Sequence, residues 1–409
     1  MFRAALSGAP ARRFFAAHAQ SCLGTGLAYV ALPLLAYDRF QTPWAIAAVL
    51  LPELLPAIVL GPLLGALVDR VGWRSCAIVA DVMRAAAFAF VVFADSLPLM
   101  VVGAVVAGLG TALFTPSALA GLPRLVGEAA RPGAMGLYGA LDDVGLTAGP
   151  ALAAGLLAVV GPDVLMGVNA VTFLCSALLL STIPGGGGVA VSRSSGLLAD
   201  ARLGVVEIAG RPELRVLIVS SASVVLCVGV MNVGEVVFAR EVLAVGGSGL
   251  ALIVTANGVG TMVGSLCTRF TVGGAWIWRR AYLVGIVFMA VELVACAVLQ
   301  SFWLVVAVFL LGGFGNGLAL VHDRLLLSSS TPEGLHGRVF ALHKTCTSLA
   351  FALSFLASSA LITGVGVQAA FALCAAALLA VFASALPRLR AAWPSPRVGS
   401  PPALGDALA

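Results

Sequence analysis

Few ionisable side chains lie inside the long apolar runs of this 409-residue chain, and they are the first candidates for chemistry. Glu53 stands in the stretch LLPELLPAI, between two prolines that weaken the helix beside it. A carboxyl group in an apolar environment can take up and release protons. Glu53 is therefore the first candidate for proton exchange, and the alternative is a position at the outer end of a helix.

Two further pairs of charged residues stand within apolar segments. Asp81 and Arg84 are three residues apart, so they share one face of a helix and can form an ion pair. This pair could be structural or could relay protons. Asp142 and Asp143 are adjacent, so their side chains point in different directions and at most one is expected to face a common cavity.

The sequence does not indicate an enzyme or a cofactor site. The cysteines form no C-x-x-C pair and do not stand at metal-ligand spacing with histidine, so no metal site is expected. No phosphate-binding G-x-x-x-x-G-K-[ST] motif is present, so direct use of ATP is not expected. Short loops poor in His, Asp and Glu leave little room for a catalytic cluster.

The composition requires a membrane to position these residues. Apolar residues make up 61% of the chain and charged residues 10%, whereas soluble domains have roughly 45–50% and about 25%. The apolar runs are too long for the strands of a membrane barrel, so they predict an all-α polytopic membrane protein of about twelve helices. The predicted spans are residues 14–37, 44–66, 75–94, 98–120, 134–160, 163–183, 214–238, 248–268, 281–299, 303–327, 339–362 and 366–387.

Arginine placement predicts the orientation. With the first residue in the cytoplasm, the predicted outside loops hold only Arg39 and Arg240, each beside an acid, and the other loop arginines face the cytoplasm. Both termini are therefore expected to be cytoplasmic, in the inner membrane. The net charge of +5 is explained by this bias, and no nucleic-acid partner is expected.

The predicted spans divide into two halves. Residues 1–183 and 214–387 each hold six spans, residues 184–213 form a cytoplasmic linker, and residues 388–409 form a cytoplasmic tail that we expect to be disordered. The pattern Gly65-x3-Asp69-Arg70 has a degraded echo about 200 residues later at 264–269. Parallel repeats of this kind are typical of transporters with a site near the membrane midplane, between the halves.

The loop between the second and third spans resembles the signature loop of the major facilitator superfamily. Its matching residues are Gly65, Asp69, Arg70, Gly72 and Arg74. The resemblance implies that Asp69 docks near Arg338, at the start of the eleventh span, and latches the cytoplasmic side shut. The alternative is that these charges only set the topology.

A second motif, in the fifth span, is similar to the "antiporter" motif of drug and proton exchangers in that superfamily. It comprises Gly136, Gly145, Gly149 and Pro150, with Ala-Ala in place of the usual closing Gly-Gly. Small residues at this spacing permit close helix packing, which is also common in membrane proteins generally. Ala104 stands where many proton-coupled exporters of the superfamily have an arginine, which leaves the coupling mechanism open.

The overall pattern looks most like the group that contains macrolide-efflux and enterobactin-exporter-like proteins. It implies a monomeric transporter that exports a small amphipathic or hydrophobic compound by proton antiport and needs no cofactor. The alternatives are a siderophore or lipid carrier, or an importer or facilitator of the same fold. By analogy with that fold, the substrate cavity would be lined by residues that include Tyr29, Asn232, Glu235 and Asn316, whereas Glu292 would lie in a peripheral span.

Overall fold

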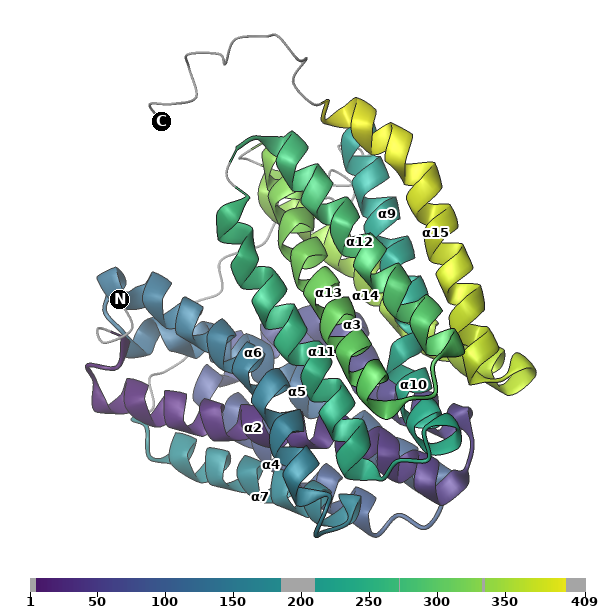
Figure 1. The fold of residues 1–409 in the computed structure, drawn as a ribbon. Helices are drawn as coiled ribbons and strands as arrows, with labels where there is room; N and C mark the ends of the chain where they lie inside the picture. Colours follow the sequence, from purple (N-terminus) through teal and green to yellow (C-terminus); the bar gives the residue numbers. More distant parts are fainter. Residues whose placement is uncertain (1–4, 185–209, 272, 333–334, 395–409) are drawn as a thin grey trace.

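The computed structural model describes residues 5–184, 210–271, 273–332 and 335–394, and helices dominate these ranges (Figure 1). The first half contains α2 (Ala9–Phe40), α3 (Pro43–Val71), α4 (Trp73–Val92), α5 (Leu97–Leu125), α6 (Arg131–Leu156) and α7 (Pro162–Ser181). The second half contains α9 (Pro212–Val228), α10 (Val230–Val237), the π-helical turn Phe238–Val242, α11 (Gly247–Cys267), α12 (Ala275–Val298), α13 (Phe302–Ser330), α14 (His336–Val365) and α15 (Val367–Ala392).

These helices confirm the predicted all-α membrane fold. Within the described ranges, eleven helices are long and apolar enough to cross a membrane, when Pro212–Val242 is counted as one continuous helix. The remaining long helix is α6, which occupies the place of the predicted fifth span and carries Asp142 and Asp143 among its many glycines. Its weaker apolar character fits a helix that packs against protein on more than one side.

Proline and glycine explain where several helices begin and end. Pro43, Pro162 and Pro212 each stand at the first residue of a helix, where the missing N–H costs nothing. Gly72, with φ of 101°, links α3 directly to α4, and Gly366, with φ of 81°, links α14 to α15. Both conformations are unfavourable for residues with a side chain, so glycine permits these abrupt turns.

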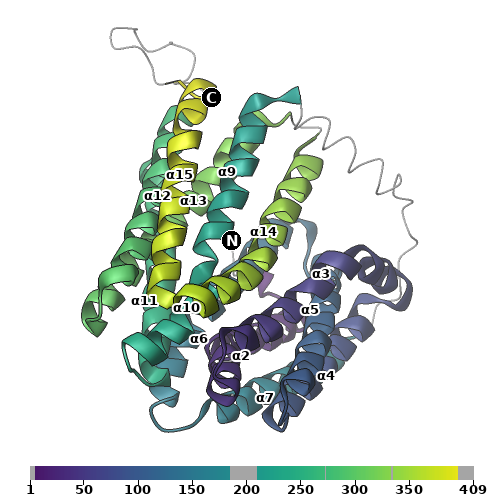
Figure 2. The same ribbon diagram turned by 90° about the vertical axis from the view of Figure 1, so that its right-hand side faces the viewer.

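The helices form two bundles that are inclined to each other (Figures 1 and 2). In the first bundle α2 packs on α6 and α7, and α4 packs on α5 and α7. In the second bundle α13 packs between α11 and α12, while α15 packs on α9 and α12. The main contacts between the bundles are made by α6 with α11 and by α3 with α14.

Two predicted segments fall largely outside the described residues. These are the linker at 184–213, of which 185–209 are not described, and the tail, of which 395–409 are not described. The disorder expected for the tail does not include residues 388–392, because α15 continues to Ala392. Leu389 is fully buried, so packing against the second bundle prolongs the helix beyond the predicted apolar run.

Candidate functional site

A central cavity of about 280 Å³ lies between the bundles and is lined mainly by the second one. Tyr29 of α2 is the contribution of the first bundle, and its hydroxyl donates a hydrogen bond to Asn232 Oδ1 at 3.0 Å. The four residues predicted for the cavity line this one space: Tyr29, Asn232, Glu235 and Asn316. The fold therefore brings together residues that are up to 287 positions apart (29 to 316) in the chain.

Glu292 also lines this cavity, although we expected it to be a weaker candidate because its span is peripheral. The residue belongs to α12, which packs on the outer side of α13, but its side chain passes α13 to reach the central space. Gly312 of α13 makes this passage possible, because a Cβ there would overlap with the Glu292 carboxylate. Asn257 Nδ2 donates to Glu292 Oε1 at 3.3 Å and holds the carboxylate in place.

The polar lining of the central cavity has a clear chemical character. It contains two carboxyl groups, three amides and the phenol of Tyr29, and no Lys, Arg or His of the described residues lines it. The remaining lining residues are apolar or glycine. Such a surface suits a ligand with an apolar body and one or more hydrogen-bond donors or positive charges.

Glu53 lies in a second, smaller cavity of about 70 Å³ in the first bundle. Tyr29 lines both cavities. Gly108 of α5 packs directly on the backbone of α3 here, because a Cβ on Gly108 would come within 2.6 Å of the Glu53 carbonyl oxygen. This position, inside a helix and beside a cavity, differs from the outer helix end that was the alternative.

Asp81 and Arg84 form a buried ion pair in α4, as their spacing predicted. The Arg84 guanidinium lies between the rings of Phe114 and Phe173, at 4.3 Å and 4.2 Å from their centroids. Cation–π contacts on both faces hold the charge in an apolar setting. Because α5 and α7 supply these rings, the pair ties three helices of the first bundle together.

The loop between α3 and α4 is anchored within its own bundle. Arg74 donates to the Leu180 carbonyl oxygen at 3.2 Å and also to that of Ser181, at the carboxyl end of α7. Asp69 and Arg70 are exposed. The ion pairs between described residues do not include one of Asp69 with Arg338, so this latch stays a prediction.

Contacts between the bundles instead gather at the opposite end of the helices. Arg240 pairs with Asp38, through Nε to Oδ1 at 3.0 Å and Nη2 to Oδ2 at 2.5 Å. The Tyr37 hydroxyl donates to Glu241 Oε1 at 2.5 Å. Arg240 and Glu241 lie in the π-helical turn, a distortion that is frequent at functional sites. The structure is thus closed at the end predicted to face outside.

The antiporter-like motif forms the contact between α6 and α2. A Cβ on Gly149 would overlap with Gly26 of α2, and a Cβ on Gly145 would come within 2.7 Å of the Cys22 carbonyl oxygen. Pro150 is buried within α6, whereas Gly136 is exposed. The motif therefore brings two backbones within the first bundle into close contact.

Asp142 and Asp143 have different surroundings, as their adjacent positions predicted. Asp143 is exposed, while Asp142 bonds to His18 and Cys22 of α2. Neither aspartate lines the central cavity. Sequence reasoning did not single out His18, although its spacing of four residues from Cys22 places both on one helix face.

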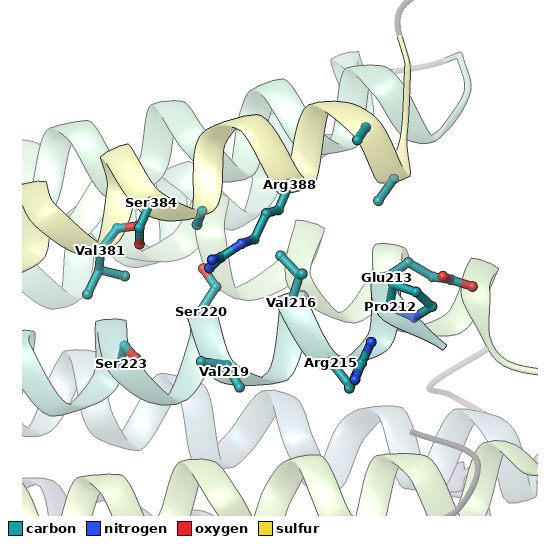
Figure 3. Close-up of a pocket in the computed structure, with 13 residues that line it drawn as sticks. Pro212, Glu213, Arg215, Val216, Val219, Ser220, Ser223, Val381, Ser384 and Arg388 are labelled. Carbon is teal, nitrogen blue, oxygen red and sulfur yellow. The ribbon is translucent and has the colours of Figure 1, made fainter. Parts of the chain in front are cut away.

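A larger groove, of about 870 Å³, lies between α9 and α15 at the end of the second bundle (Figure 3). Arg388 of α15 extends toward Ser220 of α9, and Arg215 lies further along α9. None of the predicted site residues lines this groove, and both of its walls belong to one bundle. The smaller central cavity is the better candidate for the functional site, because both bundles contribute to it and its polar groups converge.

Two bundles of membrane-length helices with a cavity between them are the architecture of membrane transporters built from two repeats. A sequence model of the Major Facilitator Superfamily matches residues 14–276, and the chain belongs to this family. This confirms the resemblance to the superfamily, and it places the chain among transporters rather than enzymes.

Sequence relatives agree with this assignment. The chain is 28% identical over 388 residues to the multidrug efflux pump Tap of Mycolicibacterium fortuitum, covering 90% of this chain and 93% of that protein. It is 23% identical over 377 residues to the uncharacterized MFS-type transporter YfiS of Bacillus subtilis (strain 168), covering 88% of each.

Solved structures share the fold. The nucleoside transporter NupG superposes with a TM-score of 0.76 at 9% identity, covering 92% of this chain and 98% of that one. A bacterial homolog of the human lysosomal transporter Spinster, in an inward-facing and unoccupied conformation, gives a TM-score of 0.68 at 15% identity, covering 94% and 98%.

Proposed function

We propose that this transporter exports a small amphipathic compound from the cytoplasm in exchange for protons, by alternating access. The observation that carries the proposal is the central cavity, where Glu235 and Glu292 face a mostly apolar space without a basic side chain. A cationic amphipathic compound would be attracted by the carboxylates and could be replaced there by protons. The multidrug efflux pump Tap is similar along nearly the whole chain, which supports export as the direction.

Three acidic side chains are the candidates for carrying the proton that moves in the direction opposite to the substrate. Glu235 and Glu292 share the central cavity, and Glu53 lines the smaller one together with Tyr29. Protonation would remove the negative charge that binds a cation, so substrate and proton would compete for the same groups. Such competition is the simplest way to couple two opposite movements, because binding of one releases the other.

The missing arginine of the fourth span fits this scheme. Ala104 offers no charge, but Arg84 of the neighbouring helix α4 packs against α5, with its Cγ 2.6 Å from the place of a Cβ on Gly110. A positive charge therefore still reaches α5, held by Asp81 and two rings. We propose that Arg84 and Asp81 keep the first bundle rigid while the acids around Tyr29 handle the proton.

In alternating access, the two bundles would separate at the end that is closed here and come together at the opposite end. Contacts of Asp38 with Arg240 and of Tyr37 with Glu241 close one end in this structure. In the other state these contacts would break, and Asp69 would reach the start of α14. We propose that the protein works as a monomer in the inner membrane with both termini in the cytoplasm, which makes the closed end the outer one.

The test is transport in proteoliposomes that contain a pH-sensitive dye, with a panel of amphipathic amines, a permanent lipophilic cation and neutral amphipaths. Wild type should show amine-dependent proton movement. Glu235→Gln and Glu292→Gln should abolish it, and Glu53→Gln should at least slow it. Glu213→Gln is the matched control, because Glu213 lies at the edge of the groove in Figure 3, and it should behave as wild type.

Other outcomes would point elsewhere. Transport without proton movement would refute antiport and leave a facilitator of the same fold. Movement of the compound in the same direction as the proton would indicate an importer. Unchanged coupling in both Glu235→Gln and Glu292→Gln would refute the assignment of the central cavity.

A further inference from the structure

Three potential metal ligands meet between α2 and α6, outside the central cavity. His18 Nε2 lies 3.2 Å from Asp142 Oδ1, Cys22 Sγ lies 3.3 Å from the same oxygen, and Cys22 Sγ lies 3.5 Å from His18 Nε2. His18 and Cys22 are buried, and the Asp142 side chain is 47% exposed. The cluster is therefore buried on the α2 side and open on the α6 side.

The cluster is held in place by the helices that supply it. His18 and Cys22 are one helical turn apart on α2, and Tyr138 and Asp142 are one turn apart on α6. The imidazole of His18 stacks on the Tyr138 ring, with centroids 4.2 Å apart and planes within 6°. Gly145, three residues after Asp142, lets α6 pack against the backbone of Cys22. These contacts fix the ring and the separation of the helices before any ion binds.

The three distances match the edges of a tetrahedral metal site. Imidazole nitrogen, thiolate sulfur and carboxylate oxygen at ordinary zinc bond lengths lie about 3.3 to 3.6 Å from one another.

We propose that His18, Cys22 and Asp142 form a binding site for a divalent transition-metal ion of the zinc class. A neutral imidazole, a thiolate and a carboxylate balance the two charges of the ion, so the occupied site would be neutral and suited to an apolar surrounding. Binding would release the thiol proton. The exposed side of Asp142 leaves the fourth position for water, and the bound ion would link α2 to α6.

This site was missed in the sequence for a simple reason. His18 and Cys22 stand four residues apart on one helix, but the third ligand, Asp142, lies on another helix and follows Cys22 by 120 residues, so the complete set cannot be recognised in the sequence. The proposal does not depend on the transported compound, since none of the three residues lines either cavity around Tyr29.

The test uses purified full-length protein without a polyhistidine tag, titrated with Co²⁺ as a spectroscopic substitute for Zn²⁺. One equivalent should produce tetrahedral d–d bands together with a thiolate-to-cobalt charge-transfer band, and Zn²⁺ should displace both. Cys22→Ala should lose the charge-transfer band. Cys227→Ala, which removes another buried cysteine, should keep it.

A second measurement guards against misfolded variants. Zn²⁺ should raise the Tm of wild type and of Cys227→Ala, but not that of Asp142→Asn or His18→Gln, whose Tm without metal should remain near that of wild type. The absence of a thiolate band in wild type would overturn the proposal, as would a band that persists in Cys22→Ala.

Discussion

The ion pair between Asp38 and Arg240 is predicted to hold closed the end of the molecule that we propose faces outside. It joins the two bundles through two hydrogen bonds of 3.0 Å and 2.5 Å, and its side chains are 31% and 29% exposed. A partly buried, two-point pair of arginine with carboxylate stabilises its state by about 1 to 2 kcal/mol after desolvation and entropy are subtracted. Asp38→Asn should therefore shift the equilibrium toward the outward-open state by about five- to thirty-fold.

Spin-label distance measurements can check this shift. Labels placed at the outer ends of α3 and α14, in a background without reactive cysteines, should report a larger fraction of long distances in Asp38→Asn than in wild type. The exchanged pair Asp38→Arg with Arg240→Asp should restore most of the short distances, because the two groups still face each other.

Arg39 provides the matched control. It lies at the same end and pairs with Asp163 at 2.5 Å, but both residues belong to the first bundle. Arg39→Gln should therefore leave the distance distribution unchanged. Equal shifts in Arg39→Gln and Asp38→Asn, or no shift in Asp38→Asn, would refute the reasoning that the cross-bundle pair sets the closed state.

Two glycines give further predictions. Gly149→Ala should lower the free energy of unfolding by about 1 to 3 kcal/mol, because the added methyl group would overlap with Gly26. Gly155→Ala has open space around it and should be neutral or slightly stabilising. Thermal unfolding in detergent measures both. Gly312→Ala should displace the Glu292 carboxylate and impair proton-coupled transport to about the same extent as Glu292→Gln, and unimpaired coupling would contradict the role assigned to this gap.

The sequence by itself determined the class of fold. Apolar runs of this length lie in a membrane, and there a helix satisfies all of their backbone hydrogen bonds. It also predicted the ion pair of Asp81 with Arg84 and the close packing of the glycines at 145 and 149. These features depend on spacing within one helix or one loop, so they can be recognised without knowledge of the partner helix. The family followed from the same local patterns.

Only the tertiary structure decided which distant residues meet. Glu292 belongs to a helix that looks peripheral, and it reaches the central cavity because a glycine on another helix leaves a gap. His18 and Asp142 are brought together by the packing of α2 on α6, and Asp38 meets Arg240 because one end of the molecule is closed. Helix periodicity fixes the face on which a side chain stands, but the partner of that face is set by how the helices pack.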